Sequence, residues 1–140
     1  MTDSTTKCDI CGLWYVTSHA PDVKLHNRMH KQWLEVVQLW GISPIHTRSS
    51  YEGDKHKYRH IFSENSEYSL SEQVDAAIAY LHVQWKERLW ASIRYNSYSS
   101  FEQEYPDIPS WIKSNYKNFS HEFSVSVQSA ICKRYGIVES

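Results

Sequence analysis

A chain of 140 residues is long enough for one hydrophobic core, and its net charge of −1 lacks the basic surplus typical of nucleic-acid-binding proteins. Its four glycines, at positions 12, 41, 53 and 136, lie far apart, which excludes a phosphate-binding P-loop, a GxGxxG dinucleotide loop and a GxSxG nucleophile turn. No apolar run reaches membrane length, and the polar start MTDSTTK does not resemble a secretory signal. We therefore expect a cytoplasmic protein, located in the host cell if it is viral.

The N-terminal stretch CDICGLWYVTSHAPDVKLHNRMH carries two cysteines and two histidines at zinc-finger spacing. Cys8 and Cys11 form a CxxC pair that offers two thiolates from one tight turn, and Gly12 allows that turn to be sharp. His26 and His30 are four residues apart and lie on one face of a helix. Zinc prefers four such sulfur and nitrogen ligands. The pattern predicts a single bound zinc ion held by Cys8, Cys11, His26 and His30.

The first predicted helix begins near Pro21 and Asp22, with Asp22 as the expected capping residue, and ends at Gly41. Its apolar residues recur at helical spacing. They are Leu25, Met29, Trp33, Val36, Val37 and Trp40.

Residues 42–65 allow two interpretations. The segment could form a β-hairpin that turns at Glu52, Gly53 and Asp54, or a loop that leads into a short helix after Asp54. We prefer the loop followed by a short helix.

Three further helices follow from periodicity and capping residues. One covers residues 71–95 behind a capping box of Ser69 and Glu72, and one covers residues 108–118 and begins at Asp107. The last covers residues 121–135, with Ser120 as its cap and Gly136 at its end. The serine-rich residues 97–110 are expected to be a connection. The fold class is thus mostly α: a ββα-like C2H2 zinc finger with its extended helix (residues 1–41), continuing into a small helical body of three to four helices (residues 42–140).

The finger residues resemble the zinc finger of the cohesin acetyltransferases. That finger reads C-x-x-C-G-[Met/Leu]-x-Tyr, with an Asp four residues before the first histidine of H-x3-H. The matching residues here are Cys8, Cys11, Gly12, Leu13, Tyr15, Asp22, His26 and His30. The resemblance implies the ligand set and a ββα-like finger. It does not imply acetyl transfer, because the rest of the chain is too short and too poor in glycine for an acetyl-CoA-binding domain.

The layout also resembles small zinc-finger proteins of phages and bacterial mobile elements, in which LHxxxHxxW and a short helical body follow the same finger. This resemblance, which includes Trp33, implies a phage-encoded inhibitor of a host defence nuclease, similar to an anti-CRISPR protein.

Two non-enzymatic functions compete. We favour a zinc-binding interaction protein that binds and modulates a protein partner, because aromatic residues are abundant and the charge is balanced. Trp14 and Trp90 are the candidate exposed anchors, although packing in the core is the more frequent role of such residues. The alternative is a nucleic-acid-binding regulator that contacts phosphates through basic residues on the finger helix and in residues 46–60. Those residues are Lys24, Arg28, Lys31, Arg48, Lys57 and Arg59.

An enzyme is the third and weakest hypothesis. His56 and His60 repeat the H-x3-H spacing, and His121, Glu122 and Cys132 could complete a second, hydrolytic metal site of a metal-dependent nuclease. Nothing in the sequence brings these residues together, so we expect no catalytic residues, no small-molecule substrate and no membrane partner.

Overall fold

The computed structural model describes residues 5–41, 48–63 and 66–138. A two-stranded antiparallel sheet, β1 (Thr5–Lys7) and β2 (Trp14–Val16), precedes helix α1 (Ala20–Trp40). The remaining elements are α2 (Arg48–Phe62), α3 (Leu70–Arg94), α4 (Tyr98–Glu104), α5 (Ile108–Asn115), the 3-10 turns η1 (Tyr116–Asn118) and η2 (Ser120–Glu122), and α6 (Val125–Tyr135). The chain is therefore mostly α-helical with a ββα arrangement at its N-terminus, as predicted.

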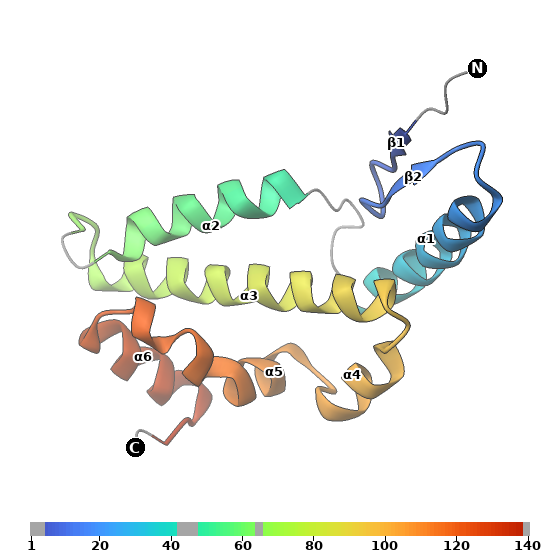
Figure 1. The fold of residues 1–140 in the computed structure, drawn as a ribbon. Coiled ribbons are helices and arrows are strands. Elements are labelled where there is room, and N and C mark those ends of the chain that lie inside the picture. Colours follow the sequence, from blue (N-terminus) through green and yellow to red (C-terminus); the bar gives the residue numbers. More distant parts are fainter. Residues whose placement is uncertain (1–4, 42–47, 64–65, 139–140) are drawn as a thin grey trace.

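Helix α3 is the central element of the molecule (Figure 1). Helix α2 packs along one side of it, whereas α4, α5 and α6 contact it from the other side (Figure 1). Helix α1 contacts both β2 and α3, and so connects the small sheet to the helical body. None of the helices in the described parts of the chain has the length and apolar character needed to span a lipid bilayer.

Helix α1 begins one residue earlier than Pro21 and ends at Gly41, which adopts a left-handed conformation with φ of 67°. Asp22 does not cap this helix, contrary to the prediction. Its carboxylate instead accepts a hydrogen bond from the backbone N–H of Val16 at 2.9 Å. Asp22 therefore holds the end of β2 against the first turn of α1.

Helix α2 begins at Arg48, well before the predicted start after Asp54, and the β-hairpin interpretation is wrong. Glu52, Gly53 and Asp54 lie inside the helix. Tyr51, Lys55, Tyr58 and Phe62 recur at helical spacing, and all but Tyr58 are buried. Burial of this face against α3 outweighs the cost of an internal glycine, which is about 1 kcal/mol relative to alanine.

The capping predictions for the later helices are confirmed except one. The Ser69 hydroxyl accepts a hydrogen bond from the Glu72 N–H at 3.2 Å and donates to the Glu72 carboxylate at 3.0 Å. Asp107 caps α5 through a 2.7 Å bond from the Ser110 N–H. Helix α6 is capped by Ser124 and not by Ser120, because residues 120–122 form a separate 3-10 turn. Residues 98–104 form α4, which was not predicted.

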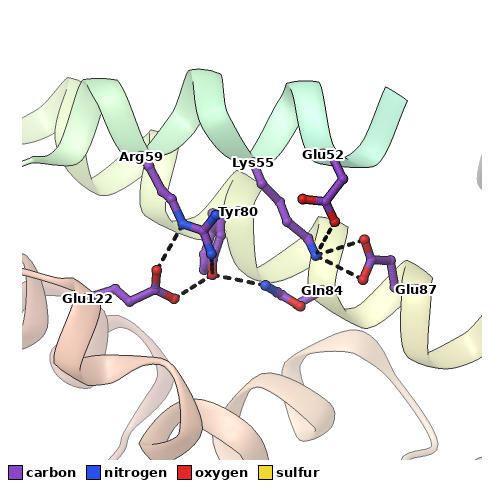
Figure 2. A network of polar contacts seen from close by, with 7 residues as sticks. All are labelled: Glu52, Lys55, Arg59, Tyr80, Gln84, Glu87 and Glu122. Carbon is purple, nitrogen blue, oxygen red and sulfur yellow. Dashed lines mark hydrogen bonds and ion pairs between the residues drawn. The ribbon is translucent and has the colours of Figure 1, made fainter. Parts of the chain in front are cut away.

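Two polar clusters tie α2 to its neighbours (Figure 2). The buried ammonium of Lys55 lies 2.8 Å from one Glu87 oxygen and 2.9 Å from the other, and 3.6 Å from Glu52. Arg59 forms a 2.9 Å ion pair with Glu122 of η2. An ion pair with a buried member depends on accurate geometry, so the contact of Lys55 with Glu87 helps to fix how α2 lies along α3, whereas Arg59 joins α2 to η2.

A single connected hydrophobic core runs through the described residues, from the finger to α6. Cys11 and Leu13 of the finger belong to the same cluster as Met29 of α1, Leu89 of α3 and Ile131 of α6. Trp33, Trp85 and Trp111 are its largest buried side chains. The finger therefore packs on the body as well as being joined to it by α1.

Candidate metal centre

Cys8, Cys11, His26 and His30 converge on one point. One ligand atom from each residue can be chosen such that all four lie within 4.8 Å of one another, and the Cys8 Sγ and His30 Nδ1 are 3.3 Å apart. Tetrahedral zinc with ordinary Zn–S and Zn–N bond lengths separates its donor atoms by about 3.3–3.8 Å. The four side chains therefore need only a small contraction to enclose one ion.

The cysteines are positioned by a tight turn that we call the knuckle (residues 8–13). Gly12 donates its N–H to the Cys8 carbonyl at 2.8 Å, and Cys8 donates its own N–H to the Leu13 carbonyl at 3.0 Å. Gly12 has a φ of 74°, a conformation that side-chain-bearing residues rarely adopt. The glycine identified in the sequence is thus the residue that lets both thiols point to the same side.

The histidines come from adjacent turns of α1. The His26 ring stacks on Tyr15 of β2, with centroids 4.1 Å apart and an interplanar angle of 6°. The Nε2 atom of His26 is buried and has no hydrogen-bond partner. A buried nitrogen without a partner is costly, and coordination of a metal ion would satisfy it.

The surroundings of the centre favour uncharged ligands unless a cation is present. Burial raises the pKa of the Cys11 thiol to about 11, and the neighbouring Cys8 adds to the effect. Burial, followed by the charge of His30, lowers the pKa of His26. A divalent cation would stabilise the thiolates and the neutral imidazoles that coordination requires. Four protein ligands leave no open coordination position, which is typical of structural and not catalytic zinc.

Two hydrogen-bonded contacts join the finger and α1 to α3, and the sequence predicted neither of them. The Trp90 indole N–H of α3 donates to the Cys11 carbonyl at 2.5 Å. Arg28 of α1 donates to the Ile93 and Arg94 carbonyls at 3.2 and 3.1 Å, at the C-terminal end of α3. A cation at that position complements the helix dipole at the end of α3.

The other predicted contact residues are dispersed over the surface. Lys24 and Lys31 are exposed on α1, and Trp14 is 64 % exposed on β2. Lys57 is exposed on α2, with its ammonium 5.7 Å from the centre of the Tyr58 ring. The side chain of Arg48 lies outside the described residues. Trp90 is half-buried and packs against the core at the contact between finger and body, which agrees with core packing and not with the role of an exposed anchor.

The residues suggested for a second metal site do not come together. His56 and His60 are exposed on α2, and Cys132 is buried on α6. Glu122 is paired with Arg59. Within residues 5–41, 48–63 and 66–138, the one cluster of three or more potential metal ligands is that of Cys8, Cys11, His26 and His30.

Comparison with known proteins agrees with this geometry. Residues 2–32 match the model of a family described as the zinc-finger of acetyl-transferase ESCO. Comparison with curated proteins and with solved structures gives no match. The family match contains all four candidate ligands and stops before the helical body. The N-terminal segment is therefore similar to the ESCO zinc finger, and its Cys/His cluster is compatible with one zinc ion.

Proposed function

We propose that this chain is a non-enzymatic interaction protein in which a structural zinc ion presents a surface to a protein partner. The observation that carries the proposal is the exposure of Trp14, directly after the knuckle, while Leu13 beside it is buried in the core. An exposed tryptophan on a rigid support is a typical anchor for a protein partner.

The contacts that the basic residues make within the fold favour a protein partner over a nucleic-acid partner. Arg28 is engaged with the end of α3, and Arg59 with Glu122, so both already serve the fold. Of the predicted phosphate contacts with described side chains, Lys24, Lys31 and Lys57 are exposed and form no ion pair with a described residue. Three lysines on a chain with a net charge of −1 give a weak electrostatic attraction for phosphate.

The identity of the partner is proposed by analogy alone. The layout shared with phage and mobile-element proteins suggests a host defence nuclease, which this protein would inhibit. The alternative function is a nucleic-acid-binding regulator, favoured by Lys24 and Lys31, which share one exposed face of α1.

A salt titration separates the two functions. Labelled duplex DNA, single-stranded DNA and RNA are titrated with the zinc-loaded chain and with a Lys24→Ala/Lys31→Ala variant, at low and at physiological salt. We expect weak binding that disappears near physiological salt. Tight binding that persists at physiological salt and is lost in the double variant would overturn the protein-binding proposal.

Affinity capture from the source cells tests directly whether the chain binds a protein partner. Trp14→Ala should reduce capture of a protein partner, whereas Tyr68→Ala, which alters a surface aromatic of the α2–α3 connection, should not. Equal capture by both variants would remove Trp14 from the proposed surface.

A further inference from the structure

A cleft of about 460 Å³ lies between the finger and the helical body. Lys7 and Trp14 line it from the finger, whereas Tyr51 lines it from α2 and Glu87, Trp90 and Arg94 line it from α3. Its volume lies in the range of clefts that hold a small ligand or a few side chains.

The walls of the cleft are aromatic and differ in exposure. Trp14 is exposed, Trp90 is half-buried and Tyr51 is buried. The Trp90 ring is fixed at one edge by its hydrogen bond to the Cys11 carbonyl. Three aromatic side chains around one hollow offer apolar surface to a flat ring, with little loss of side-chain freedom on binding.

The charged side chains that line the cleft, Lys7, Glu87 and Arg94, give it a net positive charge. The Glu87 carboxylate is offset by Lys55, which reaches both of its oxygens (Figure 2). Lys7 and Arg94 form no ion pair with any residue that the structure describes. An occupant that places a carboxylate beside Lys7 and Arg94 would complement this charge.

We propose that this cleft binds an extended segment of the partner protein that carries an aromatic side chain beside an Asp or Glu. The aromatic ring lies among Trp14, Trp90 and Tyr51, and the carboxylate faces Lys7 and Arg94. This assignment rests on the proposed function and names the chemistry of the partner. A nucleic-acid strand fits less well, because such strands follow a continuous basic groove, whereas Lys7 and Arg94 are the only basic residues among the described residues that line this cleft.

The geometry also makes the cleft depend on zinc. One wall belongs to the finger and the other to α2 and α3, and Trp90 lines the cleft while it holds the carbonyl of a ligand residue. Loss of a metal ion from the candidate centre should free the knuckle and so move Trp14 away from Trp90. Segment binding and zinc binding are therefore linked, and each strengthens the other.

The test uses random twelve-residue peptides displayed on phage and selected against the zinc-loaded full chain. We expect enrichment of an aromatic residue adjacent to Asp or Glu.

In fluorescence anisotropy, the enriched peptide should bind Trp14→Ala about tenfold more weakly than the wild type. Arg94→Gln should also weaken binding, and replacement of the peptide's acid by Lys should reduce it for the wild type more than for Arg94→Gln. Zinc content and circular dichroism of each variant show that it is folded, and Tyr68→Ala is the matched control.

The remaining outcomes contradict the proposal. Enrichment without an aromatic-acidic pair, unchanged affinity in folded Trp14→Ala and Arg94→Gln, or tighter binding of adenosine monophosphate or oligo-dT than of any peptide would overturn it. If the variants still capture a protein partner from the source cells at wild-type level, the cleft assignment fails and the proposed function stands. If the wild type captures no protein and binds oligonucleotides at physiological salt, the proposed function itself fails.

Discussion

The Tyr80 hydroxyl joins α2, α3 and η2 through one donated and two accepted hydrogen bonds (Figure 2). It donates to the Glu122 carboxylate and accepts from Arg59 at 2.8 Å and from Gln84 at 2.9 Å. The residue has no exposed surface. Burial, and then the hydrogen bond to Glu122, raise the pKa of Tyr80 from 10.0 to about 12. The neutral hydroxyl is thus part of the packing of three elements.

Replacement of Tyr80 by Phe should change how stability depends on alkaline pH. The pKa is higher in the folded chain, so this group's contribution is complete below pH 10 and is lost as the pH rises through about 12. The wild type should therefore lose more free energy of unfolding between these pH values than Tyr80→Phe. Urea unfolding at a series of pH values measures the difference, with Tyr68→Phe as the control. Parallel pH profiles for wild type and Tyr80→Phe would show that the hydroxyl is not held as described.

Arg28 provides a second prediction at this scale. Its guanidinium binds the last carbonyls of α3, so Arg28→Ala should lower the free energy of unfolding by about 1–2 kcal/mol. Lys24→Ala, an exposed site on the same helix, should change it by less than about 0.5 kcal/mol. Chemical denaturation compares the two variants. If Arg28→Ala were as stable as the wild type, the contact with α3 would have no structural role.

At the scale of elements, what the sequence predicts depends on how local the signal is. Helices α1, α3, α5 and α6 have clear apolar periodicity and local end signals such as Gly41, the Ser69–Glu72 box and Asp107. The start of helix α2 has no such local signal in the sequence. Gly53 resembles a turn residue, and the buried face of the helix includes a lysine. That lysine, Lys55, can be buried because the Glu87 carboxylate of α3 neutralises its charge. The spacing of apolar residues in the sequence cannot predict an ion pair between residues so far apart in the chain.

The same reasoning applies to the candidate site. The cluster of four candidate metal ligands follows from spacing alone, because CxxC and H-x3-H are local patterns. The contacts of Trp90 with Cys11 and of Arg28 with Ile93 join residues that are far apart in sequence. Arg28 lies at the border of the apolar stripe of α1, where a long basic side chain either faces solvent or reaches across a neighbouring helix.

Gly53 provides a test of α2 as a helix. Apart from the local backbone of the helix and the two neighbouring residues, no atom lies within 4 Å of the position that a Cβ would occupy there. Gly53→Ala should therefore raise the free energy of unfolding by about 0.5–1 kcal/mol, because alanine favours the helix and restricts the unfolded chain. Gly41→Ala should lower it, since φ at Gly41 is 67°. Thermal denaturation compares the two. A destabilising Gly53→Ala would favour a turn at this position and contradict the assignment of α2.

At the scale of the whole molecule, a metal ion at the candidate centre would stabilise the contact between finger and body. Cys11 and Leu13 pack in one cluster with Leu89 and Ile93, and the Cys11 carbonyl is bound to Trp90. Helices α2, α3, α5 and α6 pack on each other without the finger. The metal should therefore influence α1 and the C-terminal half of α3 more than the opposite end of the molecule.

Removal of the metal with a chelator should destabilise the region near the finger more than the opposite end of the molecule. Removal of the metal should lower the thermal midpoint and remove hydrogen-exchange protection from α1 and from the end of α3 near Ile93. Protection of the other end of α3, near Ala77, and of α6 should persist, because these regions lie far from the centre (Figure 1). Exchange measured by mass spectrometry, with and without chelator, follows each peptide. Unchanged protection near Ile93 would show that finger and body are independent of one another.

The metal content of the purified chain tests the central claim most directly. Protein prepared without added metal and analysed by native mass spectrometry and elemental analysis should contain about one zinc ion per chain. Cys8→Ser and His30→Ala should lose the ion, because each removes one of four ligands, whereas His56→Ala and Cys132→Ser should retain it. Absence of zinc from the wild type, or its retention in Cys8→Ser and His30→Ala together with its loss in His56→Ala, would contradict the assignment of the metal centre.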